Sequence, residues 1–222
     1  MNVSQAIRQR LSARAFKPDV PPAAMVRGIL ELAARAPSGG NLQPWHVHAL
    51  AGAPLAQLLA RVADAPLQAE PEYAVYPPQL PEPWRTRRWR NGMQLYDIVG
   101  IARDDKPARE RQMLRNAALF GAPVAVFISV ERRMGLPQWV DLGMYAQNLM
   151  LLAAEQGLAT CPQAYWARCS RAVKEFLGLP ESRMLAIGMA LGWADEAEPV
   201  NALRTERDPF DVWGEMRGFD AP

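Results

Sequence analysis

Apolar residues recur at helical spacing along much of the chain. One such face consists of four residues about one turn apart, Met25, Ile29, Leu32 and Ala36. It predicts a helix over 22–35, with Pro21 and Pro22 at its start. Comparable patterns predict helices over 3–10, 54–64, 94–101, 107–119, 142–156 and 170–177. Gly157 and Gly178 follow the last two helices and are typical C-terminal caps.

Three short segments have the patterns of strands. Ala122–Val130 and Leu185–Trp193 are almost continuously apolar, as buried central strands are, whereas Trp45–Leu50 alternates. Gly188 and Gly192 leave room beside the second segment for another part of the chain to approach closely. Because strands and helices mix without a regular alternation, the chain is predicted to be an α+β sandwich with helices on both faces of a sheet.

Two segments lack periodicity. Residues 66–83 are dense in proline and acidic side chains, which predicts a surface loop, and the basic, aromatic segment 84–90 follows it. The last thirty or so residues are polar with scattered apolar side chains, which favours an arm wrapped over another subunit. We therefore predict one domain over 1–222, with a proline-rich excursion at about 66–92 and a C-terminal arm from about 195.

Composition narrows the classes of function. The 222-residue chain is half hydrophobic and has a formal net charge of +2, which disfavours nucleic acid or an anionic membrane as its main partner. No apolar run approaches the roughly 20 residues of a membrane span. Two cysteines and the lack of a signal-peptide core predict a cytoplasmic protein. His46 and His48 have a metal-compatible spacing but no acidic or cysteine ligand nearby, so we predict no metal site.

Two segments have the chemistry of a phosphate-binding site. If the segment Arg10–Phe16 is extended, Arg10, Ser12 and Arg14 point to one side. Two guanidinium groups and a hydroxyl on one face suit a phosphate. The loop Ala36–Trp45 contains two glycines and several small polar residues, and such loops bring backbone N–H groups close to a ligand.

Four segments together resemble the FMN-dependent nitroreductase family over nearly the full length of the chain. They are Arg10–Phe16, Ala36–Trp45, Gly157–Ala164 and Asn201–Pro209, and they occur in the order that the family has. Each motif is weak alone, but four in this order are specific. The segments 101–106 and 120–123 look closest to family members that reduce nitrobenzoate-type aromatics.

The resemblance implies a fold and an assembly. The fold is an α/β/α sandwich with a mixed, mainly antiparallel central sheet, and its C-terminal arm is exchanged with the partner of a homodimer. One FMN binds non-covalently at each of two sites in the dimer interface. Because the flavin supplies the chemistry, no side chain is predicted to be catalytic.

The resemblance also assigns cofactor-binding residues. Arg10 and Arg207 would hold the FMN phosphate with Ser12, and Arg14 would lie near the pyrimidine edge. The residues expected to reach the flavin of the other subunit are Pro37, Ser38, Gly39, Asn41 and Gln43. Those expected to line the flavin are Pro162, Gln163 and Ala164. The chain departs from many relatives at Ala164, where they have glycine or glutamate, and at Thr205, where some have lysine and where Arg204 offers a substitute contact.

The resemblance implies an NAD(P)H-dependent, ping-pong, two-electron reduction of nitroaromatic acceptors, including nitrobenzoate-like ones, or of quinone acceptors. Alternatives on the same scaffold are flavin reduction, reductive dehalogenation and flavin breakdown. Trp84, Arg88 and Trp89 are candidate substrate-binding residues, although the tryptophans could equally anchor the loop. The basic cluster 85–90 suits either solvent or an anionic carboxylate or nucleotide phosphate. A nucleic-acid-binding module built on the same segment is a further alternative, which the near-neutral charge disfavours.

Overall fold

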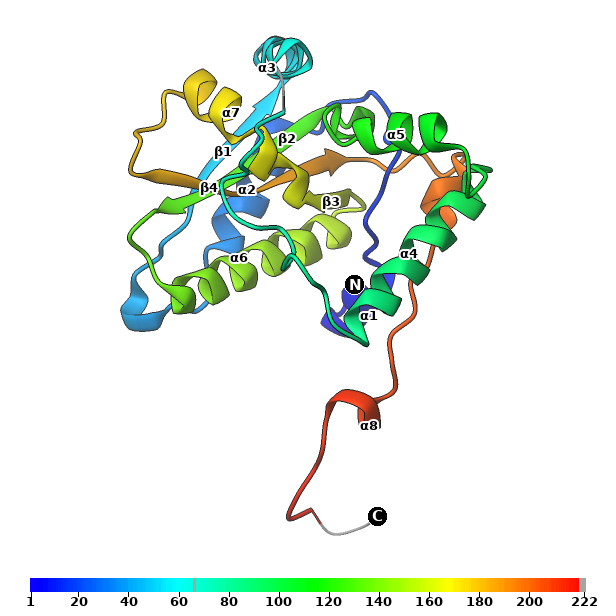
Figure 1. Ribbon diagram of the computed structural model, residues 1–222. Helices are drawn as coiled ribbons and strands as arrows, with labels where there is room; N and C mark the ends of the chain where they lie inside the picture. Colours follow the sequence, from blue (N-terminus) through cyan, green and yellow to red (C-terminus); the bar gives the residue numbers. More distant parts are fainter. Residues whose placement is uncertain (66, 220–222) are drawn as a thin grey trace.

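A four-stranded sheet forms the centre of the computed structural model, which describes residues 1–65 and 67–219 (Figure 1). In spatial order its strands are β1 (His46–Ala51), β2 (Val124–Glu131), β4 (Arg183–Gly192) and β3 (Ala159–Gln163). Every neighbouring pair is antiparallel. A parallel bridge between Ser12 and Thr160 extends the sheet at its β3 edge. The four named strands thus form an antiparallel sheet, which confirms the predicted mainly antiparallel pairing, and the only parallel contact among the described residues is this isolated bridge.

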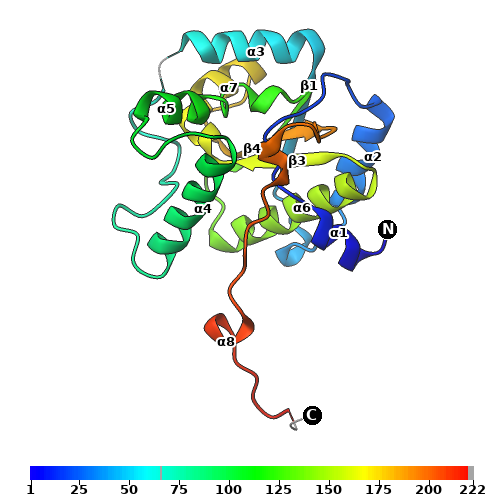
Figure 2. The same ribbon diagram turned by 90° about the vertical axis from the view of Figure 1, so that its right-hand side faces the viewer.

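Helices cover both faces of this sheet (Figure 2). They are α1 (Val3–Gln9), α2 (Ala23–Ala33), α3 (Gly52–Asp64), α4 (Trp84–Ile98), α5 (Lys106–Leu114), α6 (Leu136–Glu155), α7 (Ser170–Leu177) and α8 (Phe210–Trp213). Helices α3 and α7 lie on one side of the sheet, and α2 and α6 lie on the other. The predicted α+β sandwich is confirmed.

Strand β2 connects the two halves of the core. Successive side chains of a strand point to opposite faces. Ala125 and Phe127 accordingly pack with the apolar residues of α3 and α7, whereas Val126 and Ile128 pack with those of α2 and α6. All four side chains are at most 1% exposed. Burial on both faces explains the uninterrupted apolar run in this part of the sequence.

Several predicted boundaries were wrong. Helix α4 begins at Trp84 rather than near residue 94, so the basic cluster belongs to the helix itself. Helix α5 ends at Leu114 and does not extend to the predicted residue 119, where Leu119 and Phe120 adopt left-handed backbone conformations (φ 51° and 56°) that an α-helix does not accommodate. Helix α6 begins at Leu136, six residues before the predicted start.

One side chain of α2 was assigned to the wrong face. Leu32 is 55% exposed, whereas the buried residues of this helix are Val26, Ile29 and Ala33. These three follow an i, i+3, i+7 spacing, which defines the face that packs on α6.

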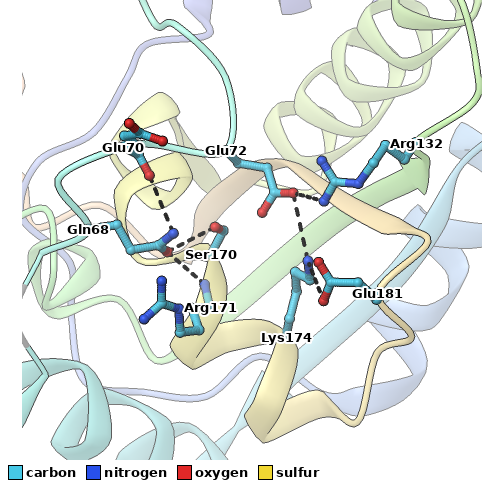
Figure 3. A network of polar contacts seen from close by, with 8 residues as sticks. All are labelled: Gln68, Glu70, Glu72, Arg132, Ser170, Arg171, Lys174 and Glu181. Atoms are coloured by element: carbon cyan, nitrogen blue, oxygen red, sulfur yellow. Dashed lines mark hydrogen bonds and ion pairs between the residues drawn. The ribbon is translucent and has the colours of Figure 1, made fainter.

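A network of polar contacts fixes the first part of the proline-rich excursion to the body (Figure 3). Residues 67–83 form turns and bends, and Pro66 lies outside the described residues. Glu72 contacts both Arg132 and Lys174, and Gln68 accepts hydrogen bonds from the Ser170 hydroxyl (3.0 Å) and the Arg171 N–H (2.8 Å). The first residues of the excursion are therefore held against the start of α7 by these contacts.

The C-terminal arm extends away from the rest of the chain and carries the short helix α8 (Figure 1). Its apolar side chains are exposed, among them Val212, Trp213, Met216 and Phe219 at 57 to 72%. Residues 220–222 lie outside the described residues. The apolar side chains of this arm are thus left largely uncovered by the described residues of the same subunit.

Candidate active site

A cavity of about 470 Å³ lies between the N-terminal segment and the beginning of the C-terminal arm. Polar side chains from three parts of the chain line it: Arg8, Arg10, Ser12 and Arg14, then Asn91 of α4, then Arg204, Thr205 and Arg207. The structure thus brings together the basic residues that the sequence placed at opposite ends of the chain. We call this space the arginine cavity.

Asn201 holds the two sides of the arginine cavity together. Its buried side chain donates hydrogen bonds to the carbonyl oxygens of Ala15 (2.8 Å) and Asp195 (2.9 Å). Its Oδ1 accepts a hydrogen bond from the backbone N–H of Arg14 (2.8 Å). Asn201 therefore fixes the start of the arm beside the N-terminal segment, and sequence reasoning assigned it no such role.

The arginines of this cavity have no acidic partners. Arg14 donates to the carbonyl of Ser12 (3.2 Å), Arg204 to the carbonyl of Asn201 (2.8 Å), and Arg207 to the hydroxyl of Thr205 (2.8 Å). Within residues 1–65 and 67–219, none of the five arginines forms an ion pair with a carboxylate. Several uncompensated guanidinium groups around one space suit a dianionic phosphate.

A buried hydroxyl beside the arginine cavity also lacks a partner in the described part of the chain. Thr160 Oγ1 is buried without a hydrogen bond, although the backbone carbonyl of Thr160 accepts from the Ala13 N–H (3.0 Å). Thr160 lines an adjoining cavity of about 400 Å³ together with Arg10 and Arg204. Buried polar atoms normally have partners, so this hydroxyl is an unsatisfied group next to the basic residues. The arginines and Ser12 of the arginine cavity form a donor set that fits a phosphate-bearing cofactor such as FMN.

The end of β3 carries the segment predicted to line the flavin. Gln163 is buried, and its side chain donates to the Asn116 carbonyl (2.9 Å) and accepts from Trp166 Nε1 (3.3 Å). The side chain is thus engaged within the subunit. Ala164 has no left-handed backbone conformation, so alanine in place of glycine introduces no strain there.

The glycine-containing loop lies far from the arginine cavity within one chain. Gly39 N–H donates to Asp141 Oδ2 (3.3 Å) near the start of α6, and the Ser38 hydroxyl accepts from the Gln43 N–H (3.0 Å). The loop occupies the opposite end of α6 from the N-terminal segment (Figure 1). A 20-residue helix is about 30 Å long. Pro37, Ser38, Gly39, Asn41 and Gln43 therefore do not join the arginines in the same subunit.

A second cavity, of about 550 Å³, separates α4 from the arm. Its α4 wall consists of Arg87, Arg90, Asn91 and Gln94, and its other wall consists of arm residues 205–208 and Trp213. The three predicted substrate residues lie outside both cavities: Trp84 and Trp89 are 54% and 56% exposed, and Arg88 stacks on Tyr76 at 4.3 Å. The sequence analysis named the basic cluster 85–90, which contains Arg87 and Arg90, as a candidate site for an anion, but it did not include Asn91 and Gln94. The four lining residues follow an i, i+3, i+4, i+7 spacing, which marks one helical face.

The ionisable groups near the sheet do not suggest a nucleophile or a metal centre. Burial raises the pKa of Cys161 to about 11, which leaves its thiol protonated at neutral pH. Burial also lowers the pKa of His46 and of His48, with a further contribution from Arg183. In the described part of the chain, no three His, Cys, Asp or Glu residues are placed to hold a metal ion. None of the helices described is long and apolar enough to cross a membrane.

Comparisons with known proteins agree with this geometry. The model of the nitroreductase family matches residues 7–193. A 4-nitrobenzoate reductase from Pseudomonas putida is 35% identical over 216 residues, which cover 96% of this chain and 95% of that protein. A chloronitrobenzene nitroreductase from Comamonas testosteroni is 34% identical over 209 residues, 92% of each chain.

A solved structure is also similar over nearly the whole chain. The crystal structure of the FMN and NADPH-dependent nitroreductase NfnB from Sphigopyxis sp. strain HMH has a TM-score of 0.94. It is 42% identical, and the match covers 99% of this chain and 100% of that one. On the strength of the family match and these relatives, this chain belongs to the nitroreductase family.

Proposed function

We propose that this protein is an FMN-dependent nitroreductase that uses NAD(P)H to reduce nitroaromatic compounds. The observation that carries the proposal is the arginine cavity, whose guanidinium groups have no carboxylate partners in the described chain and suit the phosphate of a bound cofactor. Similar proteins are named 4-nitrobenzoate reductase and chloronitrobenzene nitroreductase, and similar structures are of FMN-dependent nitroreductases.

We assign the residues of the arginine cavity to the FMN phosphate. FMN, when bound, supplies the two-electron chemistry of the reaction. Arg10, Ser12 and Arg207 hold the phosphate by charge-assisted hydrogen bonds, and Arg204 occupies the position from which it can add another. Arg14 faces the same cavity and provides a fixed positive charge toward the pyrimidine edge, where negative charge develops on reduction. The backbone at Pro162–Ala164 lines the ring.

We propose that the site is completed by a second copy of the chain. The loop containing Ser38 and Gly39 is at the far end of α6 from the arginine cavity, so it can reach a flavin only in a neighbouring subunit. Leu136 and Val140, near that loop, are 83% and 63% exposed. Together with the apolar residues of the arm, they offer the surface that a homodimer would bury.

The acceptor class follows from the relatives. Nitrobenzoate-like aromatics are the first compounds to test, and quinones are a second class of flat two-electron acceptor. We place the reaction in the cytoplasm, because the two described cysteines are unpaired thiols and the supply of reduced nicotinamide is there.

The cofactor assignment is tested by Arg207→Ala in the full chain. We expect purified wild-type protein to be yellow and to be bleached by NADPH. Loss of a charge-assisted contact should weaken FMN binding about tenfold or more, with an unchanged melting temperature of the apoprotein. Arg27→Ala is the matched control, because Arg27 of α2 is also an arginine, is 80% exposed, pairs with Glu31 and lines neither cavity. If Arg207→Ala retained FMN like the control, the phosphate assignment would be wrong.

A further inference from the structure

Helix α4 presents a polar face to the C-terminal arm. Arg87, Arg90, Asn91 and Gln94 follow the spacing at which a packed helix normally carries apolar residues, yet no residue of α4 is buried. Two polar surfaces that face each other across about 550 Å³ are not a packed interface. This cavity has the size and polarity of a site for part of a polar ligand.

Arg90 is the free cation of this face. The other arginines of the basic cluster have partners: Arg85 pairs with Glu82 (2.7 Å), Arg87 with Asp208, and Arg88 with the ring of Tyr76. Within residues 1–65 and 67–219, the Arg90 side chain forms no hydrogen bond or ion pair. It therefore keeps its donors available to an anionic ligand.

The charges lining this cavity leave an excess of one positive charge. Three arginines, Arg87, Arg90 and Arg207, face two carboxylates, Glu206 and Asp208. Asp208 is neutralised by Arg87, and Glu206 is exposed to solvent. The excess is therefore associated with the side of the cavity that α4 forms, where Arg90 lies.

The position of the cavity indicates what it binds. Asn91, Thr205 and Arg207 line both this cavity and the arginine cavity, so the two spaces adjoin at the phosphate end of the proposed FMN site. No residue of the ring-lining segment 162–164 contributes to it. A compact acceptor such as a nitrobenzoate must reach the flavin ring, whereas a dinucleotide that reaches the ring also extends far beyond it.

We propose that Arg90 binds the ribose 2′-phosphate of NADPH in this cavity and so makes the enzyme prefer NADPH to NADH. The inference rests on the proposed function. A 2′-phosphate is the only group that distinguishes the two donors, and a guanidinium group without a competing carboxylate is suited to bind it bidentately.

The test compares Arg90→Gln with the wild-type holoenzyme, using both nicotinamides as donors and 4-nitrobenzoate as acceptor. We expect the ratio of kcat/KM for NADPH to kcat/KM for NADH to fall about tenfold, through a higher KM for NADPH. Calorimetry should show that 2′,5′-ADP binds more tightly than 5′-AMP to wild type, and that Arg90→Gln abolishes this difference. Arg85→Gln is the control, because Arg85 pairs with Glu82 and does not line the cavity.

Three results would overturn the inference. In the first, Arg90→Gln leaves the donor ratio unchanged. In the second, it raises KM for 4-nitrobenzoate but not for nitrobenzene, which lacks a carboxylate, and Arg90 then binds the acceptor. In the third, it changes the oligomeric state, and the cavity is then a subunit contact. Failure of the proposed function is distinct from all three, because the wild-type protein would then oxidise neither donor.

Discussion

At the residue scale, a glycine allows a buried tryptophan to pack closely against the sheet near the proposed flavin site. A Cβ atom added to Gly188 of β4 would lie 2.3 Å from Cδ1 of Trp166, a side chain that is completely buried. Trp166 in turn donates a hydrogen bond to Gln163, which belongs to the segment expected to line the flavin. The absence of a side chain at Gly188 thus allows the tryptophan to support β3 from behind.

Gly188→Ala is therefore expected to destabilise the protein by about 1–3 kcal/mol, because overpacking displaces a rigid ring rather than a flexible chain. Urea unfolding monitored by tryptophan fluorescence measures the change. Gly28→Ala is the control, because Gly28 lies in α2, is exposed and has nothing within 4 Å of an added Cβ. This variant should be up to about 1 kcal/mol more stable than wild type through helix propensity. Equal stability of the two variants would show that Trp166 can move aside.

At the element scale, a small charged network fixes the excursion that leads to α4 (Figure 3). The side chains of Glu72 and Lys174 are only 6% and 10% exposed, and their charged atoms lie 3.7 Å apart. Glu72 also pairs with Arg132, and the Glu72 N–H donates to the carbonyl of Ala167 (2.9 Å). Because burial desolvates these charges, removing one partner costs more than it would at the surface.

Glu72→Gln should lower the free energy of unfolding by about 3 kcal/mol, since it leaves Lys174 buried with only the exposed Glu181 nearby. Glu175→Gln is the matched control, because Glu175 lies on α7 next to Lys174. Its partner Arg61 and Glu175 itself are about half exposed, so the loss should stay below about 1 kcal/mol. Thermal unfolding of both variants measures the difference. A loss as small as the control's would show that water already solvates Lys174.

The elements that sequence reasoning missed have local causes. Strand β3 contains Pro162, which lacks a backbone N–H donor and disguises the strand pattern in the sequence. The proline is tolerated because β3 is an edge strand, paired along its length only with β4. Helix α6 starts before its apolar face does, at Leu136 and Pro137, where proline suits the first turn. Buried strands such as β2 were predictable because burial on both faces leaves an unbroken apolar run.

The candidate site was predictable only in part, for a similar reason. Family motifs identified Arg10, Arg14 and Arg207, but nothing local in the sequence marks Asn201 as the residue that brings them together. Its role depends on contacts with residues more than 180 positions away in the sequence, such as Arg14. The sequence marked the basic cluster 85–90, which contains the lining residues Arg87 and Arg90, but it gave no reason to extend that cluster to Asn91 and Gln94. The predicted contacts Trp84 and Trp89 are more than half exposed and do not line the cavity.

At the scale of the whole molecule, we expect the subunit to fold without the end of its C-terminal arm but to need that arm for a complete FMN site. Between 209 and 219, every described residue except Gly214 is exposed, so this segment adds little to the core of its own subunit. The last anchoring contacts before it are those of Asn201 and the pairing of Arg87 with Asp208. An unanchored apolar segment of this kind gains stability only by packing on another surface.

If the protein is the dimer that we propose, deleting residues 209–222 should convert it into a folded monomer that binds FMN weakly. The subunit core stays intact, so the far-ultraviolet circular dichroism should not change, whereas the loop at Ser38 and Gly39 would no longer be held over a neighbouring site. Sedimentation velocity gives the mass, and absorbance of the released flavin gives the occupancy. The point variant Met216→Asp, in a side chain that is 60% exposed, should shift both measurements in the same direction. A truncated protein that remains dimeric and retains its flavin would place the subunit contact on the body of the sandwich and leave the arm without a part in it.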